Sequence, residues 1–401
     1  MGIIIQKFGG SSVATTEKLE LVAEKIIKEK NKGSQVVVVV SAQGKTTDRL
    51  ISEEKEITDS PSRREHDVLV STGEQITIAK LAMMLNKKNC KAISLTGWQV
   101  PIITNSIYGN GRIRYINNEI IINLLNSDNV VVVAGFQGID ENYNITTLGR
   151  GGSDTTAVAL ASSLHAERCD IYTDVDGVFT SDPRIVENVK KLSNVSYDEM
   201  LEMASAGAKV LHNRCVEIGK KYNVPIYVKS TFEKDSVGTL ISEQGSVENL
   251  VITGVAKDDN ISKITIVGME NKIGKTAELF RMLATANISV DVILQSVGEN
   301  VSKDITFTIN TSDLSKTVKL LEENKNILNA KEILHSEDLS KVSIIGLGIA
   351  NKPGVAADVF EALYEENVNM HLVTTSEIRI SVLVNTQDAT RAVNAIHKKF
   401  I

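Results

Sequence analysis

The chain has 401 residues, more than one ordinary hydrophobic core accommodates, so two or three domains are expected. Hydrophobic residues make up 42% and charged residues 23% of it, as in ordinary soluble globular proteins. The net charge of −6, without a local cluster of Lys and Arg, excludes a basic surface for nucleic acid.

The sequence predicts neither secretion nor membrane insertion. Met1 leads directly into a strand-like segment, and apolar runs such as Val36–Val40 and Val130–Ala134 are too short to span a bilayer. The three cysteines are widely spaced, odd in number and match no metal-ligand pattern. We therefore expect a protein of the reducing cytoplasm.

From Gly2 to about Ile241, β-branched runs alternate with segments of helical periodicity. The predicted strands are Ile3–Gln6, Val36–Val40, Ala92–Leu95, Val130–Ala134, Ile171–Thr173 and Ile226–Val228. The predicted helices are Glu17–Lys30, Glu74–Lys87, Asn117–Asn126, Thr155–Ala166, Tyr197–Ser205 and Val210–Tyr222. Strands that are apolar on both faces and alternate with helices predict an α/β domain, with a mostly parallel sheet covered on both sides.

A polar, glycine-containing stretch at residues 242–249 is expected to be a linker, and an internal repeat follows it. Lys263-Ile-Thr-Ile-Val-Gly268 and Asn271-Lys-Ile-Gly274 recur as Lys341-Val-Ser-Ile-Ile-Gly346 and Asn351-Lys-Pro-Gly354. Each copy continues with a predicted helix, an Asn at its end and two strands. A period of about 80 residues predicts two small βαββαβ units rather than a solenoid.

The two copies are not equally complete. The first, residues 261–335, has all six predicted elements, whereas the second, residues 341–401, ends after its second helix. A missing strand would leave an open sheet edge. The strand predicted at residues 250–256 is the candidate to fill that edge, so we expect the first unit to be inserted within the second.

Four glycine-bearing segments of the N-terminal domain are expected at strand-to-helix junctions. They are Lys7-Phe-Gly-Gly-Ser-Ser12, Ser41-Ala-Gln-Gly-Lys-Thr-Thr47, Gly135-Phe-Gln-Gly138 and Gly149-Arg-Gly-Gly-Ser-Asp154. A single glycine-rich segment is about as often only a tight turn as it is part of a ligand-binding site. Four on one face of a parallel sheet indicate an anion site, because free amides and helix N-termini bind phosphate there.

Common phosphate-binding motifs do not account for these segments. Gly44-Lys45-Thr46 resembles the end of a Walker A motif, but Val39 stands where that motif requires Gly. The GxGxxG fingerprint and the protein-kinase HRD and DFG sets are absent from the sequence. The sequence therefore predicts another kind of phosphate site.

Further segments complete a recognisable set. Together with Ser71-Thr-Gly-Glu74, Tyr172-Thr-Asp-Val-Asp-Gly-Val-Phe179 and Gly207-Ala-Lys-Val-Leu-His212, the glycine segments resemble the signatures of the aspartate kinase family. Their order and approximate spacing match along essentially the whole chain, and the repeat resembles that family's paired ACT domains. The resemblance implies a three-layer α/β/α, carbamate-kinase-like domain at residues 1–241 and two ferredoxin-like βαββαβ ACT domains.

The resemblance also implies roles for single residues. An attacking carboxylate needs no strong base, so catalysis consists of aligning two anions and neutralising charge on the phosphoryl oxygens. The implied catalytic residues are Lys7, Asp154 and Lys209. The implied aspartate ligands are Ser41, Thr47, Glu74, Arg150 and Ser153. The implied nucleotide ligands are Lys7, Gly9, Gly10, Ser11, Thr173, Asp174, Phe179, Arg184 and Lys209.

A structural role is the alternative for Asp154, which also suits the N-cap of the helix that follows Gly152. ATP is the implied phosphoryl donor, with Mg²⁺ held mainly through its phosphates and water, so no protein metal ligand is predicted.

Regulation by an amino acid, most simply L-lysine, is the further implication of the ACT pair. The implied effector residues are Asn351, Gly354, Val355, Asn369, Thr375, Ser376 and Glu377 in the second unit and Gln295 in the first. Ile273 departs from the Pro-Gly expected in the first unit, whereas Pro353-Gly354 is present in the second. Threonine and diaminopimelate stay open as effectors. ACT units commonly pair between copies, so a homodimer or tetramer is expected.

Two other functions stay open at this point. A sister kinase acting on glutamate, acetylglutamate or UMP is disfavoured by Ser71-Thr-Gly-Glu74 and by the ACT pair. A catalytically inactive amino-acid sensor is disfavoured by Lys7, Asp154 and Arg150. The expected reaction converts ATP and L-aspartate to ADP and 4-phospho-L-aspartate, the entry to lysine, threonine and methionine synthesis.

Overall fold

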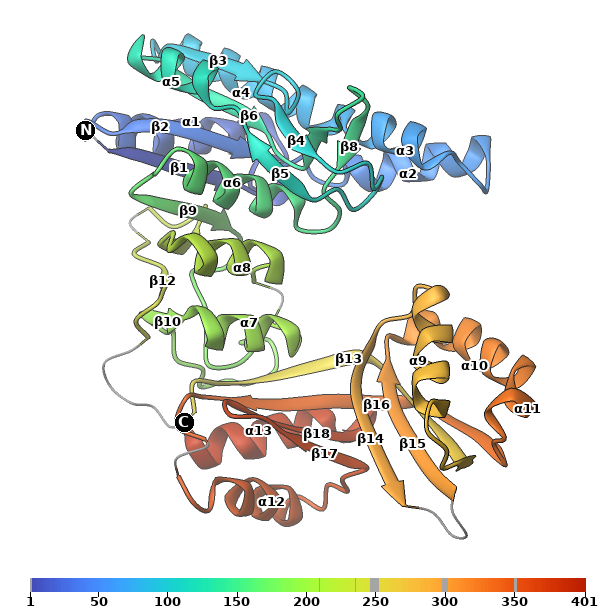
Figure 1. The fold of residues 1–401 in the computed structure, drawn as a ribbon. Helices are drawn as coiled ribbons and strands as arrows, with labels where there is room; N and C mark the ends of the chain where they lie inside the picture. The colour runs from blue at the N-terminus through green and yellow to red at the C-terminus, as the bar shows by residue number, and fades with distance from the viewer. Residues whose placement is uncertain (1, 209, 235, 246–251, 298–301, 350–351) are drawn as a thin grey trace. The chain divides into compact units, whose positions relative to one another are not determined.

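The valine-rich run Gln35–Val40 forms strand β2 near the middle of an eight-stranded sheet (Figure 1). The computed structural model describes residues 2–208, 210–234, 236–245, 252–297, 302–349 and 352–401. The strand order is β10-β12-β11-β9-β1-β2-β6-β3. Among the described strands of this sheet, every pair is parallel except β11 with β12, which confirms the predicted α/β class.

The central strands are apolar on both sides, so helices cover both faces of the sheet. The bounds are β1 Ile3–Phe8, β3 Ala92–Leu95, β6 Val130–Ala134, β9 Arg168–Thr173, β10 Asn194–Ser196, β11 Ile226–Ser230 and β12 Thr239–Ser242. Helices α1 (Thr16–Lys30) and α4 (Thr72–Lys87) share one core with Phe8. Lys7, next along β1, points to the opposite face, where α6 (Gly152–Ser163) packs.

The predicted strands and helices of this part are all present, with ends shifted by a few residues. Helix α5 spans Glu119–Asn126, α7 spans Tyr197–Ser205 and α8 spans Asn213–Tyr222. Two further helices, α2 (Thr46–Ile57) and α3 (Arg63–Val70), had not been expected because their sequences are dominated by charged residues. Asn213 begins α8, so the helix starts later than the predicted Val210.

A second, four-stranded sheet also escaped prediction. Its order is β5-β4-β7-β8, with β4 Ile102–Thr104, β5 Ile113–Ile116, β7 Gln137–Ile139 and β8 Ile145–Thr147. Strands of three or four residues are too short to show a period-2 pattern. This sheet is functionally relevant because β8 leads into the glycine segment that precedes α6.

Helices α3 and α4 run on as one helical stretch, Arg63–Lys87. By length and composition alone this stretch could cross a membrane, but half of its most apolar window is buried inside the protein. The core helix of a globular protein passes the same test. The stretch also carries two buried carboxyl groups, Asp67 and Glu74.

The C-terminal unit is built on one six-stranded sheet with the order β14-β15-β13-β16-β18-β17. Two long strands, β13 (Gly254–Glu270) and β16 (Glu332–Ile345), are antiparallel neighbours along most of their length. The remaining strands are β14 Val290–Val297, β15 Ser302–Ile309, β17 Leu372–Thr375 and β18 Arg379–Asn385. The helices are α9 Lys275–Thr285, α10 Leu314–Glu323, α11 Lys325–Leu328, α12 Val355–Glu365 and α13 Ala389–Phe400.

The two repeats share the long strands. Residues 262–270 of β13 pair with β15, while residues 254–258 of the same strand pair with residues 341–345 of β16. Those residues of β16 also pair with β18, so the start of β13 supplies an edge strand to the second repeat. Each repeat has its own apolar core, one around Phe307 and Leu279, the other around Val382 and Leu363.

One segment of the N-terminal sequence belongs to this second unit. Contacts group Thr180–Val189 and Ala206–Ala208 with Asn249–Ile401, and the rest of Met1–Glu248 forms the first unit. The Val255 amide donates to the Thr180 carbonyl over 2.8 Å, and the Ser181 hydroxyl donates to the Val255 carbonyl over 2.9 Å. Nothing in the local sequence of Thr180–Val189 indicated that this polar segment packs with the C-terminal unit.

Candidate active site

The carboxyl ends of β1, β2 and β6 bring three of the glycine segments together. The Ser41 amide donates to the Phe8 carbonyl over 3.1 Å, and the Gly135 amide donates to the Val40 carbonyl over 3.0 Å. The Gly44 amide donates to the Gly10 carbonyl over 3.0 Å. A side chain at Gly10 would collide with the Ala42 carbonyl at 2.7 Å, so close backbone approach explains this glycine.

Lys7 and Asp154 form the charged centre of this edge. Lys7 is the fifth residue of β1, and its Nζ lies 2.5 Å from Asp154 Oδ1, on α6. The side chains are 10% and 15% exposed, so both charges are partly withdrawn from water. The two atoms are close but are not aligned as a hydrogen bond. The lysine therefore keeps donors available for another anion.

The helix-cap reading of Asp154 is wrong, because α6 begins at Gly152 and its cap is Gly151. Gly151 has a φ of 67°, and the helix has no side-chain cap. Asp154 lies in the first helical turn, where a negative charge is favoured by the helix dipole. A side chain at Gly151 would also collide with the Cβ of His212 at 2.3 Å, so this loop requires glycine.

Glu74 is buried with one oxygen engaged. It is 3% exposed, and its Oε1 accepts the Ala42 amide over 3.0 Å, which ties α4 to the glycine segment after β2. Oε2 has no hydrogen-bond partner within the described part of the chain. Burial raises the pKa of Glu74 to about 8, against the lowering effect of the Ala42 amide. An unpartnered buried oxygen at a site is a natural acceptor for a cationic group.

The other four expected aspartate ligands lie on two of the glycine segments, the one after β2 and the one that leads into α6. Ser41 follows β2 and Thr47 lies in the first turn of α2, and both are half-buried. Ser153 is buried in α6, and a side chain added at Gly135 would meet its Cβ at 2.7 Å. Arg150 is exposed, and its guanidinium makes no ion pair or hydrogen bond among the residues that the structure describes. It is free to meet a ligand.

The expected nucleotide ligands fall into two groups. Gly9 precedes the short 3-10 turn Gly10–Ser12, and its amide donates to the Tyr172 carbonyl over 3.3 Å. Ser11 is exposed, and Asp174 is exposed and accepts from the Thr173 hydroxyl over 3.0 Å. Phe179 is half-buried and pairs with Lys191 in an isolated β-bridge. These residues all lie in the first unit.

The structure does not describe two expected nucleotide ligands, Arg184 and Lys209, as part of that group. Arg184 belongs to the second unit, and its Nη2 pairs with Asp182 Oδ2 over 2.7 Å. Lys209, also expected to act in catalysis, lies outside the described residues.

The expected effector residues surround two features of the second repeat. Gly354 caps α12 with a φ of 98°, and the next residue, Val355, is buried. Asn369, Thr375, Ser376 and Glu377 are exposed. The Ser376 amide donates to the Arg379 carbonyl over 2.7 Å in the turn between β17 and β18. Gln295 is exposed on β14 of the first repeat, and Asn351 lies outside the described residues.

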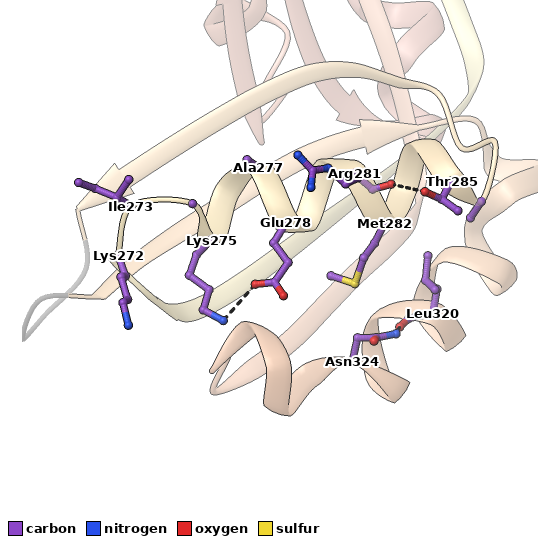
Figure 2. A pocket seen from close by; sticks show the side chains of 12 residues that line it. Lys272, Ile273, Lys275, Ala277, Glu278, Arg281, Met282, Thr285, Leu320 and Asn324 are labelled. Atoms are coloured by element: carbon purple, nitrogen blue, oxygen red, sulfur yellow. Dashed lines mark hydrogen bonds and ion pairs between the residues drawn. The ribbon is translucent and has the colours of Figure 1, made fainter.

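A hollow of about 860 Å³ in the first repeat lies beside α9 (Figure 2). Lys275, Arg281 and Met282 line it from that helix, and Leu320 and Asn324 line it from the neighbouring helical segment. Lys275 is already paired with Glu278 over 3.0 Å. The hollow contains none of the expected effector residues.

Sequence reasoning missed two charged residues next to the Gly149–Asp154 segment, one buried (Asp67) and one half-buried (Arg214). Asp67, on α3, is fully buried and accepts hydrogen bonds from Thr147 and Gly109. Arg214, on α8, donates to the Leu148 and Gly111 carbonyls. The only available signal was that Asp67 stands two helical turns before Glu74, and α3 itself had not been predicted.

The chain resembles known proteins over its whole length. The model of the amino acid kinase family matches residues 2–230, and that of the ACT domain matches residues 264–324 and 342–400. The aspartokinase of Bacillus sp. (strain MGA3) is 50% identical over 401 residues, covering 100% of this chain and 97% of the relative. Aspartokinase 2 of Bacillus subtilis (strain 168) is 49% identical, covering 100% and 98%.

Solved structures agree with these relatives. Aspartokinase III of E. coli in complex with aspartate and ADP (R-state) has a TM-score of 0.83 at 28% identity, covering 99% of each chain. The same enzyme in complex with lysine and aspartate (T-state) has a TM-score of 0.78, covering 100% of this chain and 99% of that one.

Proposed function

The chain belongs to the amino acid kinase family, among the aspartokinases with ACT domains, and we propose that its Lys7–Asp154 pair is the centre of the aspartate kinase site. The activity is ATP-dependent phosphorylation of L-aspartate. The observation that carries the assignment of the site is this pair, set where the glycine segments after β1, β2 and β6 meet.

In the proposed mechanism a side-chain carboxylate oxygen of aspartate attacks the γ-phosphorus of ATP. The bond from that phosphorus to the bridging oxygen breaks, and ADP leaves with the electron pair. Lys7 neutralises charge that develops on the transferred phosphoryl oxygens, and Lys209 is proposed as the second cation. Asp154 holds the Lys7 ammonium group in place, so the lysine need not reorganise during the reaction.

Substrate recognition is assigned to groups of opposite charge. Glu74 binds the ammonium group through its unpartnered oxygen, and Arg150 offers a planar fork to a carboxylate of aspartate. Ser41, Thr47 and Ser153 supply neutral hydrogen bonds. Gly9, Gly10, Ser11, Thr173, Asp174, Phe179 and Arg184 are proposed for the nucleotide.

Mg²⁺ is proposed to enter with ATP. No group of three or more His, Cys, Asp or Glu side chains suited to a metal ion occurs among the described residues. A magnesium ion bound to nucleotide phosphates keeps most of its waters and needs few protein ligands. When bound, it would neutralise charge on the phosphates.

We further propose that L-lysine regulates the enzyme through the second ACT unit. The domain limits proposed are residues 1–241, 261–335, and 250–256 with 341–401. We also propose a homodimer or tetramer joined through ACT units, and a cytoplasmic location.

The test of the proposed site is a coupled assay of ADP formation with a hydroxylamine trap. An acyl phosphate reacts with hydroxylamine to give a hydroxamate, whereas phosphate esters do not. Hydroxamate formation that requires ATP and L-aspartate, and that is lost in Lys7→Ala, is the expected result. Equal rates with glutamate, acetylglutamate or UMP would contradict the substrate assignment.

A further inference from the structure

Two charged side chains, the buried Asp67 and the half-buried Arg214, hold the segment that carries Arg150, and neither belongs to the expected ligand set. Asp67 comes from α3 and Arg214 from α8, elements that flank the segment from different parts of the chain. Both contact residues immediately before Gly149, where the backbone turns through a φ of 77°.

Asp67 is 0% exposed, and its carboxylate accepts three hydrogen bonds. Oδ2 accepts the Thr147 amide over 2.7 Å and the Gly109 amide over 2.9 Å, and Oδ1 accepts the Thr147 hydroxyl over 3.0 Å. Burial raises the pKa of Asp67, and the bonds from Gly109 and Thr147 oppose that rise. Both oxygens are therefore engaged with the residues that lead into the loop.

Arg214 makes the complementary contacts. Nη1 donates to the Leu148 carbonyl over 2.8 Å, and Nη2 donates to the Gly111 carbonyl over 2.6 Å. The segments that Arg214 contacts are also hydrogen-bonded to each other, because the Gly111 amide donates to the Thr147 carbonyl over 2.8 Å. The Asp67 carboxylate thus accepts from backbone amides, and the Arg214 guanidinium donates to backbone carbonyls, of the same two segments, residues 109–111 and 147–148.

Only Gly149 separates this anchored backbone from Arg150, whose side chain is exposed. A long exposed side chain has many rotamers, so the position of its backbone decides where its fork can reach. Asp67 also lies on the continuous helical stretch that carries Glu74. Asp67 therefore connects the helical stretch that carries Glu74, the proposed ammonium ligand, to the backbone that precedes Arg150, the proposed carboxylate ligand.

We propose that Asp67 and Arg214 are positioning residues, which anchor the Thr147–Gly149 backbone so that Arg150 meets the carboxylate of aspartate. This inference rests on the proposed role of Arg150. It predicts a defect in aspartate recognition that acts through Arg150, rather than a loss of the nucleotide site or of the fold.

The experiment is a double-mutant cycle on KM for aspartate, using Asp67→Asn, Arg150→Ala and the double variant. Asp67→Asn puts an amide donor among three hydrogen-bond donors, and we expect KM for aspartate to rise about 10-fold or more. KM for ATP should stay within about twofold. In the Arg150→Ala background the same substitution should change KM for aspartate by less than about twofold, because the group it positions is gone.

Asp140→Asn is the matched control. Asp140 is 1% exposed and accepts the Asn142 and Asn144 amides, each over 2.9 Å, in the neighbouring β7–β8 turn. Within the described part of the chain it makes no hydrogen bond to Thr147 or Leu148, so its substitution should leave KM for aspartate unchanged at a similar loss of thermal stability. Should Asp67→Asn not fold, Thr147→Val removes one 3.0 Å bond at nearly constant volume and should raise the same constant severalfold.

Additive effects in the cycle, equal rises in both KM values, or the same defect in Asp140→Asn would overturn the positioning role. If Arg150→Ala raises KM for aspartate while Asp67→Asn and Thr147→Val do not, the inference fails and the proposed site stands. If Arg150→Ala leaves KM for aspartate unchanged, the proposed role of Arg150 fails and the inference fails with it.

Discussion

Lys7 and Asp154 lie side by side although they come from the first strand of the chain and from a helix that follows the seventh and eighth strands. The Nζ–Oδ1 distance is 2.5 Å. Because the pair occupies the carboxyl end of the central strand β1, it lies where parallel α/β sheets bind ligands. A lysine held by a carboxylate in a partly dehydrated position is prepared to stabilise charge that appears during phosphoryl transfer.

Lys7→Ala should lower kcat by roughly 10²–10³, with a modest loss of thermal stability, because the lysine acts on charge that develops in the transition state. Steady-state kinetics and a melting curve measure the two quantities. Lys341→Ala is the control, since Lys341 is 4% exposed in its side chain and lies 2.5 Å from Asp291 Oδ2 in the ACT region. A kcat within a few-fold of the parent for a folded Lys7→Ala protein would contradict the assignment.

Asp154→Asn should lower kcat and leave KM for aspartate and for ATP near the parent values. The amide keeps the size of the side chain but removes the charge that holds Lys7. Gly151, not Asp154, caps α6, so the substitution should cost little helix stability. A drop in the melting temperature without a change in kcat would instead assign Asp154 a structural role.

Glu74 predicts a pH dependence of aspartate binding. With a pKa of about 8, the free carboxyl is mostly protonated at neutral pH, and binding of an ammonium group requires its ionised form. KM for aspartate should therefore fall as the pH rises toward 8, and binding below pH 8 should release a proton. Calorimetry in two buffers with different ionisation enthalpies measures that release, which Glu74→Gln should abolish. Proton release that persists in Glu74→Gln would rule out this group as the source.

The raised pKa of Glu74 also predicts how the free energy of unfolding changes with pH. Its pKa is raised on folding, so the folded protein holds a proton that the unfolded chain loses between about pH 4.5 and 8. The free energy of unfolding should fall across that window relative to Glu74→Gln, by on the order of 1 kcal/mol per pH unit. Denaturant titrations at several pH values test this, and parallel curves for the two proteins would contradict it.

L-Lysine should inhibit the enzyme through the second repeat. A coupling of about 1–3 kcal/mol between effector and substrate sites would change affinity roughly 5–150-fold. Ser376→Tyr, in the exposed turn after β17, should fill the effector site and remove inhibition without lowering the uninhibited rate.

The internal repeat supplies a matched control for that variant. Ser296 of β14 occupies the position in the first repeat that Ser376 occupies in the second, and it is exposed as well. Ser296→Tyr should leave inhibition by lysine intact. Desensitisation by Ser296→Tyr alone would move the effector site to the first repeat, and inhibition by threonine but not lysine would contradict the choice of effector.

Much of the kinase sheet could be predicted because its strands are long, apolar and β-branched. Gln35–Val40 and Val130–Ala134 have few alternatives to buried parallel strands, and the glycine segments after them signal tight turns. The strands at Ile102–Thr104 and Ile145–Thr147 could not be predicted, since three residues show no periodicity. The helix α3, which carries Asp67, was missed for a different reason, because charged residues dominate its sequence.

The sequence by itself determined the α/β class and the tandem repeat, because local periodicity and glycine placement record them directly, and its resemblance to the aspartate kinase family implied the residues expected to carry the chemistry. Only the tertiary structure decided that Asp154 pairs with Lys7 instead of capping its helix, that Thr180–Val189 joins the C-terminal unit, and that Asp67 and Arg214 grip the backbone before Arg150. Each of these depends on groups that are far apart along the chain. Burial and hydrogen-bond partners of that kind arise only when separate elements pack, so no local pattern contains them.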